Sequence, residues 1–227
     1  MTKLKNKKAV VLLSGGLDSA TTLYVAKHQG YQPTALIFDY GQRHKKEILF
    51  AKGLAKLAGC SYMVIKILFP WKGSALLDKT MPIAQRRSLK TMGETIPSTY
   101  VPSRNIIFLS FAASFAETIG ACAIFIGANA IDYSGYPDCR PKFLKAFQAA
   151  LAAGTKAGVE KKGIVIYAPL LKKTKKEIIA LGLQLKVPYR MTWSCYQGKQ
   201  KPCRVCDSCR LRQKGFDANK IKDPLFL

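Results

Sequence analysis

Short apolar runs alternate with longer amphipathic segments along most of the chain. Five runs have the length of buried β-strands: Ala9–Leu13, Thr34–Phe38, Tyr62–Ile67, Ala123–Ile126 and Ile164–Tyr167. Apolar residues recur with helical spacing around residues 17–28, 44–58, 105–119, 141–153 and 174–185. Strands that alternate with helices favour right-handed crossovers and a parallel sheet covered on both faces. The expected fold class is therefore α/β, with a doubly wound, mostly parallel sheet.

Two segments depart from this alternation. Residues 68–104 are rich in Pro, Gly, Ser and Thr and have little periodicity, which is typical of a long functional loop. The last part of the chain is instead rich in Cys, Lys and Arg. Because 227 residues fit one domain with a small appendage, we predict an α/β domain over residues 1–190 and a zinc-binding segment over 191–227 packed on the same domain.

The stretch SGGLDS joins the first predicted strand to the first predicted helix. Open α/β sheets bind ligands at this end of a strand, and the free N–H groups of a helix N-terminus favour anions. Gly15 and Gly16 allow the backbone to approach a phosphate closely, and Ser14 and Ser19 add hydroxyl donors. Asp18 alone would repel phosphate, so it predicts a Mg²⁺ ion that bridges to the polyphosphate. A glycine turn with a capping Asp or Ser is the alternative without a ligand.

Four cysteines near the carboxyl end have the spacing of a metal site. They are Cys195, Cys203, Cys206 and Cys209. Zn²⁺ accepts four thiolates in a tetrahedron, and two-residue spacers let a short turn of backbone present them. Four protein ligands leave no open position, so the predicted Zn²⁺ is structural. An iron–sulfur cluster, redox-active thiols or unrelated free cysteines are the alternatives.

The charge of the chain is strongly positive, with 37 Lys and Arg against 13 Asp and Glu and a net charge of +24. Such a charge favours acidic partners, among them nucleotides, acidic small molecules and RNA. The lysines are scattered, however, and a nucleic-acid interface requires clustering. We therefore favour a solvated basic surface over direct binding of nucleic acid.

No segment has the features of a secretory signal or a membrane span. Only Ala9–Leu13 is continuously apolar after the basic start, and no later run reaches membrane-spanning length. We expect a cytoplasmic protein that does not contact membranes. In that compartment the seven cysteines are expected as metal ligands, catalytic groups or core residues rather than as disulfides.

The SGGLDS stretch resembles the pyrophosphate-binding loop of the ATP pyrophosphatase (PP-loop) superfamily. A P-loop carries a lysine for transfer of the terminal phosphoryl group, whereas this loop serves enzymes that adenylate a substrate oxygen and release pyrophosphate. The resemblance implies a sheet of the adenine-nucleotide α-hydrolase type, ATP as co-substrate and Mg²⁺. It assigns the loop residues to pyrophosphate and Mg²⁺: Ser14, Gly15, Gly16, Leu17, Asp18 and Ser19.

Three further stretches narrow the resemblance. IFDYGQRH follows the second predicted strand, PSRNIIFLS opens a predicted helix, and GANAIDYSGYPDCRPKF follows the fourth predicted strand. Together with SGGLDS and the four cysteines, they make the chain similar to the family of 7-cyano-7-deazaguanine synthases over essentially its whole length. That family acts on the route to the tRNA base queuosine, so the resemblance implies an ATP-dependent carbon–nitrogen ligase.

The reaction that this resemblance implies uses ATP twice. The carboxylate of 7-carboxy-7-deazaguanine is adenylated, and ammonia displaces AMP to give the amide. The amide oxygen is then adenylated in turn, and elimination leaves the nitrile. The implied partners are therefore the small deazapurine, ATP and ammonia, and the family resemblance also implies a homodimer.

The same resemblance assigns the remaining site residues. Arg104 would neutralise charge that develops on phosphate or carboxylate, with a surface ion pair as the alternative. His44 would relay protons during loss of water, with a capping or hydrogen-bonded histidine as the alternative. The positions that match the family's substrate loops are Asp39, Arg43, Asp132, Tyr133, Tyr136, Asp138 and Arg140. Tyr133 or Tyr136 would alternatively pack into the core.

Two other classes of function remain open. A tRNA-thiolating enzyme of the same superfamily would also combine SGGLDS with cysteines and a basic surface, but it requires a reactive cysteine near the loop. A non-enzymatic zinc module that binds RNA is the third class, and its affinity would fall steeply with salt. A Ser-His-Asp hydrolase is not expected, because the chain has two histidines and His28 belongs to a predicted helix.

Overall fold

A five-stranded parallel sheet forms the centre of the protein. The computed structural model describes residues 7–88, 96–129 and 135–226. The strands are β1 (Lys7–Leu12), β2 (Tyr31–Asp39), β3 (Ser61–Lys66), β4 (Ala123–Phe125) and β5 (Val165–Tyr167), in the spatial order β3-β2-β1-β4-β5. All five predicted strands are present, with ends shifted by a few residues.

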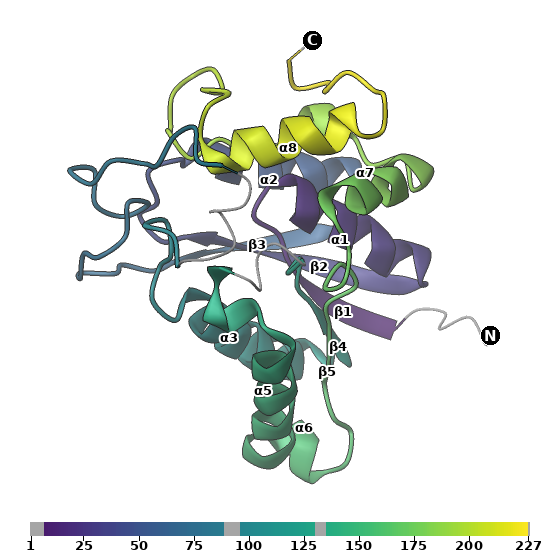
Figure 1. Ribbon diagram of the computed structural model, residues 1–227. Helices are drawn as coiled ribbons and strands as arrows, with labels where there is room; N and C mark the ends of the chain where they lie inside the picture. The colour runs from purple at the N-terminus through teal and green to yellow at the C-terminus, as the bar shows by residue number, and fades with distance from the viewer. Residues whose placement is uncertain (1–6, 89–95, 130–134, 227) are drawn as a thin grey trace.

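Helices cover both faces of this sheet (Figure 1). The predicted helices are α1 (Leu17–His28), α2 (Lys46–Leu57), α3 (Arg104–Ile119), α5 (Pro141–Gly154) and α7 (Lys175–Gln184), and the chain adds α6 (Lys156–Val159) and α8 (Asp207–Asp217). Two 3₁₀ turns, η1 (Pro137–Cys139) and η2 (Tyr189–Met191), complete the elements discussed below. Helices α1, α2, α7 and α8 lie on one face, and α3, α5 and α6 lie on the other (Figure 1). The doubly wound α/β fold class is therefore confirmed.

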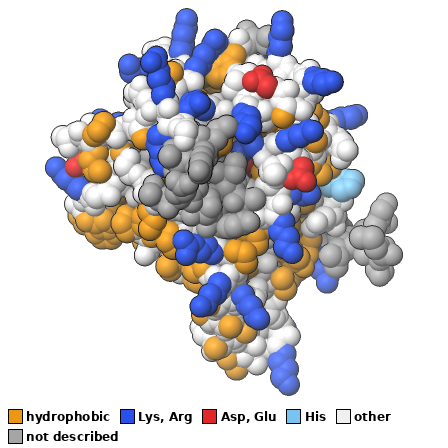
Figure 2. All heavy atoms as spheres, viewed as in Figure 1, with side chains coloured by type: hydrophobic (Ala, Val, Ile, Leu, Met, Phe, Trp, Pro, Cys, Tyr) orange, Lys and Arg blue, Asp and Glu red, His pale blue; other side chains and the backbone are white. Residues whose placement is uncertain are grey.

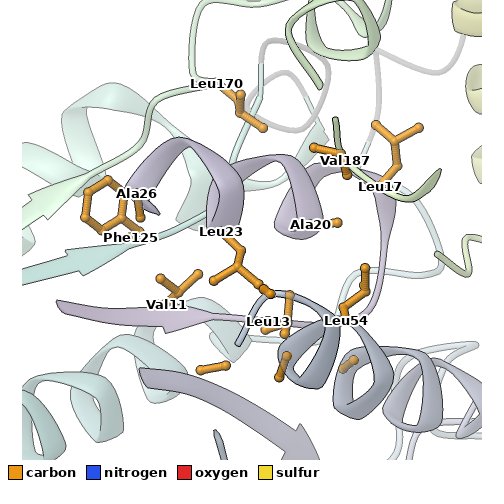
Figure 3. Close-up of a cluster of buried hydrophobic side chains, with 14 of the residues drawn as sticks. Val11, Leu13, Leu17, Ala20, Leu23, Ala26, Leu54, Phe125, Leu170 and Val187 are labelled. Atoms are coloured by element: carbon orange, nitrogen blue, oxygen red, sulfur yellow. The ribbon is translucent and has the colours of Figure 1, made fainter. Parts of the chain in front are cut away.

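The strand sequences explain why the sheet is covered twice. Successive side chains of a strand point to opposite faces. In β1, Ala9 and Val11 join a core beneath α1, α2 and α7, whereas Val10 and Leu12 join a second core beneath α3 and α5. Figure 3 shows Leu23 of α1 in the first core. An apolar run without polar alternation therefore requires helices on both sides.

The order of the strands places a ligand-binding crevice between β1 and β4. From β1 the chain first adds β2 and β3 on one side and later returns to add β4 and β5 on the other. Open sheets bind ligands outside the carboxyl ends of strands at such a switch point. Gly127, just after β4, approaches α1 so closely that a Cβ there would lie 3.1 Å from the backbone nitrogen of Ser19. The SGGLDS loop and the end of β4 therefore meet.

The two segments that departed from the periodic pattern both pack near this crevice. Residues 68–88 and 96–103 contain no helix or strand, apart from an isolated bridge between Gln85 and Cys206. Phe216 of α8 is fully buried in the core beneath α1 and α7.

Among the described residues, no helix combines the length and the apolar character that crossing a membrane would require.

Candidate active site

A pocket opens at the carboxyl ends of β1, β2 and β4. It is lined by Ser14, Gly16, Leu17, Asp18 and Ser19 of the SGGLDS loop. The same pocket is lined by Arg104 at the start of α3 and by Tyr136 just before η1. The pocket is also lined by Phe38, Tyr40 and His44 of IFDYGQRH, so SGGLDS and the three further stretches singled out in the sequence all contribute to one cavity.

The SGGLDS loop is held in shape by its own hydroxyl groups. The Ser14 and Ser19 hydroxyls lie 3.0 Å apart, and the amide nitrogen of Gly16 donates to Ser14 Oγ at 3.2 Å. Gly16 is the N-cap of α1 and supplies no side-chain cap, so the helix presents backbone N–H groups towards the pocket rim. Gly15 has a φ of 85°, a backbone conformation that favours glycine. This arrangement suits a bound anion.

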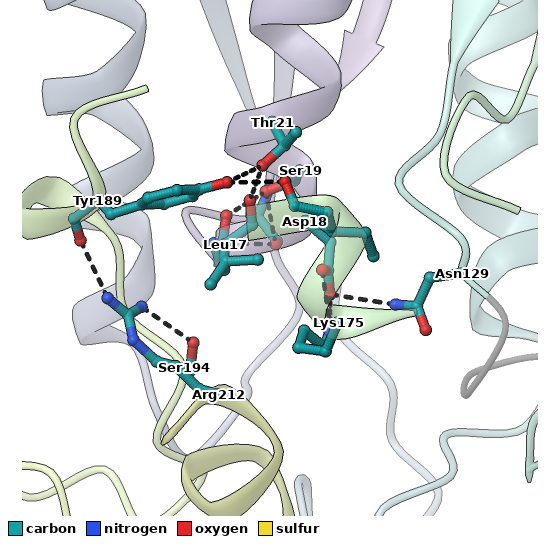
Figure 4. Close-up of polar contacts among 12 residues, drawn as sticks. Leu17, Asp18, Ser19, Thr21, Asn129, Lys175, Tyr189, Ser194 and Arg212 are labelled. Carbon is teal, nitrogen blue, oxygen red and sulfur yellow. Dashed lines mark hydrogen bonds and ion pairs between the residues drawn. The ribbon is translucent and has the colours of Figure 1, made fainter. Parts of the chain in front are cut away.

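Asp18 is paired with Lys175, the first residue of α7. Lys175 Nζ donates to both carboxylate oxygens, at 2.8 and 2.7 Å, and the Asn129 side-chain amide donates at 3.2 Å (Figure 4). Asp18 therefore does not cap α1. Its oxygens are hard ligands of the kind that Mg²⁺ prefers, and a cationic group already lies against them.

Lys175 was not identified as a site residue from the sequence, although a local signal marks its position. Thr174 and Glu177 form a capping box, which defines Lys175 as the first residue of α7. The Thr174-x-x-Glu177 pattern could have located this helix start, but not the carboxylate that Lys175 would meet. That carboxylate is 157 residues away in the chain.

Arg104 lies at the start of α3 among groups that favour its charged form. Burial alone lowers the pKa of Arg104, but Tyr40 and Tyr136 and the nearby Cys139 and Asp138 raise it above its ordinary value. Burial in turn raises the pKa of Tyr40 to about 12. The guanidinium is thus a permanent positive charge in the pocket wall, and no salt bridge to it is present among the described residues.

Asp138 supports the start of α3 from behind the pocket wall. Ser103 precedes the helix with a φ of 56° and makes no side-chain cap. The buried Asp138 carboxylate instead accepts the backbone N–H of Asn105 at 2.9 Å. The Asn105 side chain also contacts Cys139 Sγ at 3.0 Å. Asp138, which matches the family's substrate loop, therefore holds the start of α3 and with it Arg104.

Several other positions that match the family's substrate loops lie outside the pocket lining. Arg43 donates to the carbonyl oxygens of Asp78 and Met81 and so anchors the long loop. Asp39 pairs with Lys45 at 3.7 Å. Arg140 is exposed at the N-cap of α5, and neither it nor Asp39 nor Arg43 lines the pocket. Asp132 and Tyr133 lie outside the described residues.

Tyr136 and His44 both line the pocket. The Tyr136 hydroxyl lies 3.0 Å from that of Thr99, which ties the turn before η1 to the long loop. His44 Nε2 lies 3.0 Å from a carboxylate oxygen of Glu47, and its ring meets the Tyr196 ring edge-on. Glu47 and Tyr196 also line the pocket, although the sequence analysis named neither as a site residue.

The four cysteines of the carboxyl-terminal segment converge on one point. The sulfur atoms of Cys195, Cys203, Cys206 and Cys209 all lie within 4.8 Å of one another. Tetrahedral Zn–S bonds of about 2.3 Å would place the sulfurs roughly 3.8 Å apart, so a single ion fits this cage. An iron–sulfur cluster fits less well, because its thiolates bind different irons and lie further apart.

Three of the four thiols have pKa values that are shifted from the ordinary value by their neighbours. Hydrogen bonds from the Cys206 and Cys209 thiols hold the pKa of Cys195 far below its usual range. The same contacts with Cys195 raise the pKa values of Cys206 and Cys209. A bound cation would favour the thiolate form of the cysteines that surround it.

The cysteine cage is connected to the SGGLDS loop through a buried tryptophan. The backbone N–H of Trp193 donates to the carbonyl of Gly15 at 2.8 Å, and its indole N–H donates to the carbonyl of Cys195 at 2.9 Å. The same segment is fixed by buried Arg212, which pairs with Asp223 and donates to Thr192 at 2.6 Å. Figure 4 shows Arg212 between Tyr189 and Ser194. The four-cysteine cage thus supports one wall of the pocket.

The charged side chains on the face of the molecule shown in Figure 2 are predominantly basic. Lys and Arg side chains are spread over this face, and Asp and Glu side chains are sparse. On this face the basic side chains are spread out and do not form a single stripe. A positive field of this kind attracts small anions such as nucleotides and carboxylates.

Comparisons with known proteins identify a matching family, similar relatives and a solved structure with the same fold. The family model described as "Queuosine biosynthesis protein QueC" matches residues 8–220. A 7-cyano-7-deazaguanine synthase from Clostridium kluyveri is 52% identical over 222 residues, covering 96% of this chain and 97% of that protein. One from Thermoplasma acidophilum is 51% identical over 222 residues, covering 98% and 92%. The NMN synthetase of Francisella tularensis has the same fold, with a TM-score of 0.52 at 14% identity over 96% of this chain and 79% of that chain.

Proposed function

The chain belongs to the QueC family of queuosine biosynthesis proteins, and from this membership we propose that it converts 7-carboxy-7-deazaguanine and ammonia to 7-cyano-7-deazaguanine. As a member of that family it is an ATP-dependent ligase. In the proposed sequence the carboxylate is adenylated, ammonia displaces AMP, and the resulting amide is adenylated on oxygen before the nitrile forms. Each adenylation converts a poor leaving oxygen into AMP and releases pyrophosphate.

One observation carries this proposal. A single pocket at the switch point combines the SGGLDS loop with Arg104 and Tyr136, which come from the stretches that resemble the family's substrate loops. The loop and the adjacent N-terminus of α1 suit a pyrophosphate leaving group, because they present hydroxyl and backbone donors. An oxygen held beside them can be activated in both halves of the reaction.

The proposed roles follow from the contacts. Asp18 holds Mg²⁺, which when bound neutralises charge on the phosphates, and Lys175 adds a second cation beside it. Arg104 stabilises negative charge that develops on the phosphate or the substrate carboxylate. Tyr136 offers a ring against which the flat deazapurine can stack. Direct substrate contacts of the other matched positions stay predictions: Asp39, Arg43, Asp132, Tyr133, Asp138 and Arg140.

The proposal makes a stoichiometric prediction. Each nitrile formed should consume about two ATP and yield about two AMP and two pyrophosphate, because two oxygens leave the same carbon and each requires its own adenylation. Supplied amide should be converted with about one ATP and without ammonia. Mass-resolved product analysis with the acid, ATP, Mg²⁺ and ammonium, and separately with the amide, measures both ratios.

Two outcomes of this assay would contradict the proposal. ADP and orthophosphate as initial products would exclude a pyrophosphate-leaving site at SGGLDS. Failure of the amide to react would exclude the two-step scheme even if AMP were formed. A mixture without ATP serves as the control.

We further propose that the four-cysteine cage holds one structural Zn²⁺ ion. Four sulfurs at mutual distances that suit one tetrahedral ion support this proposal, because four thiolates complete the coordination of a structural Zn²⁺. The ion would fix the segment that carries Trp193, whose backbone holds Gly15. We also propose action in the cytoplasm and a boundary between the α/β domain and the zinc-binding segment near residue 190.

Cys206→Ser should lower metal content and stability together. Replacing one thiolate weakens the site, and metal binding contributes to folding. We expect a loss of about 3 kcal/mol, or roughly 6–12 °C in Tm. Elemental analysis and thermal unfolding measure the two effects. Cys122→Ser, at a half-buried cysteine outside the cage, is the matched control. Full stability of metal-free protein, or visible absorption from bound iron and sulfide, would contradict the assignment.

A homodimer is also proposed on the basis of family resemblance. Exposed apolar side chains on the edge strand β3 and the following loop, among them Met63, Leu68 and Trp71, offer a surface for it. Sedimentation of the protein over a range of concentrations measures the oligomeric state. A strictly monomeric species at all concentrations would refute this proposal.

A further inference from the structure

A histidine and a glutamate form a buried pair in the wall of the pocket. His44 Nε2 lies 3.0 Å from Glu47 Oε2, and the two side chains are 5% and 12% exposed. Both residues line the same cavity as Ser14, Asp18 and Arg104. A charged or proton-exchanging pair that is this well buried beside a phosphate-binding loop is a candidate for acid–base chemistry.

The position of the glutamate is fixed by a second contact. The other oxygen of Glu47 accepts an N–H from the Gln42 side chain at 3.0 Å. Gln42 is in turn held by the backbone of β2, because it donates to the carbonyl of Phe38 at 3.1 Å and accepts from the backbone N–H of Tyr40 at 2.8 Å. Both oxygens of the carboxylate are therefore engaged, and the carboxylate orients the histidine.

This contact determines which nitrogen of the histidine can accept a proton. With Glu47 as the acceptor, the proton of the neutral imidazole lies on Nε2, and Nδ1 carries the free lone pair. Nδ1 is buried and has no hydrogen-bond partner among the described residues. Buried polar atoms without a partner are rare in folded proteins. Because the His44 side chain lines the pocket, a bound substrate group would supply the missing partner.

The proposed reaction requires such an acceptor in both halves, and at the same atom. When ammonia attacks the adenylated carboxyl, an N–C bond forms, the C–O bond to AMP breaks, and the nitrogen must lose a proton to become the amide. When the amide oxygen attacks ATP and pyrophosphate leaves, the nitrogen loses a second proton to give the neutral adenylated imidate. When this imidate eliminates AMP, the C–O bond breaks, and the nitrogen loses its last proton as the electrons of that N–H bond form the third C–N bond. All three protons leave a nitrogen on the same carbon.

We propose that His44 Nδ1 accepts the protons from the substrate nitrogen in both halves of the reaction. Glu47 is the positioning residue, which holds the required tautomer and stabilises the imidazolium that forms. Each proton passes from His44 to water before the next is accepted. This inference rests on the proposed function and adds to it the base and its partner.

Other carboxylates in the described part of the pocket are less suited to this task. Asp18 is paired with Lys175 and lies in the phosphate-binding loop. Asp138 does not line the pocket and accepts a backbone N–H at the start of α3. His44 is therefore the acceptor that the geometry supports.

The test separates proton removal from adenylation. His44→Gln and Glu47→Gln are compared with wild type, and His28→Gln, at the exposed second histidine, is the matched control. We expect formation of the amide from ammonium, and of the nitrile from supplied amide, to fall by about 10²–10⁴-fold in both site variants, the range for loss of general base catalysis. Exchange of pyrophosphate into ATP with the acid should stay within a few-fold of wild type, because adenylation of the acid removes no proton from nitrogen.

Two further measurements exclude a merely structural effect. Hydroxylamine is a much weaker base than ammonia and is largely unprotonated at neutral pH, so both site variants should form the hydroxamate at rates close to wild type. Added imidazole should partly restore ammonium-dependent turnover in His44→Ala, because it can occupy the vacated space as a base. A structural defect would respond to neither reagent.

Two outcomes would overturn the inference. If pyrophosphate exchange fell as far as amide formation, His44 would serve the phosphates or the fold instead. If ammonium-dependent turnover were unchanged in His44→Gln, the histidine would have no part in proton transfer. Failure of the proposed function itself would be distinguishable, because wild-type protein would then produce neither pyrophosphate exchange nor nitrile.

Discussion

Asp18→Asn should lower the rate of adenylation by roughly two orders of magnitude or more while the fold survives. A carboxylate ligand is worth several kcal/mol when it holds a metal ion that stabilises charge in the transition state. The amide keeps the shape of the side chain and can still contact Asn129 and Lys175, so the α1–α7 contact is preserved. Pyrophosphate exchange measured across a range of Mg²⁺ concentrations should show a raised Mg²⁺ requirement, with circular dichroism reporting the fold.

The competing explanation is that Asp18 serves only to position Lys175. In that case Lys175→Met would match Asp18→Asn, the double variant would be no worse, and the Mg²⁺ requirement would be unchanged in all three. Glu160→Gln is the matched control, because it removes a carboxylate that pairs with two lysines on the surface. Near-normal activity of folded Asp18→Asn would refute the metal role altogether.

Gly15→Ala should damage both stability and activity more than any other single methyl addition in the loop. Gly15 has a φ of 85°, and a Cβ there would overlap the backbone carbonyl oxygen of Glu47 and lie 2.9 Å from the backbone nitrogen of Ala51. Backbone strain adds roughly 1–2 kcal/mol and overpacking roughly 1–3 kcal/mol, so we expect a loss of about 2–5 kcal/mol. Denaturant unfolding and pyrophosphate exchange measure the two effects.

A second glycine separates the two causes. Gly59 also has a positive φ of 60°, but a Cβ there would meet nothing within 4 Å. Gly59→Ala should therefore show the strain contribution alone, roughly 1 kcal/mol, with unchanged activity. Equal effects of the two substitutions would mean that α2 does not press against the loop as the structure shows.

Much of the fold could be predicted because its determinants are local and periodic. The apolar runs and helical segments were located from spacing alone, and the observed ends differ by a few residues. Helix α8 was not predicted, because the residues that it buries include Arg212 and Gly215 besides Cys209 and Phe216. A buried face that contains a charged residue paired with Asp223 has no apolar stripe to detect.

The candidate site, like the fold, could be predicted only where its determinants are local in the sequence. The SGGLDS loop and the four-cysteine spacing were identified from the sequence, because each places its chemical groups within a few residues of one another. Two other contacts were not identified from the sequence, because each joins segments that are distant in the chain. They are the pairing of Lys175 with Asp18 and the capping of α3 by Asp138. Arg43 illustrates the converse: its neighbours His44 and Glu47 line the pocket, whereas Arg43 turns to the carbonyls of the long loop.

By itself, then, the sequence determined which elements form and which chemical groups they carry. The tertiary structure decided which of those groups meet, because the order of strands in the sheet sets which loops share an edge. β1 lies beside β4 as well as β2, so the loop after β1 meets Gly127 and Asn129 across the switch point. That order depends on how the whole chain buries apolar strands on two faces at once, which no local spacing contains.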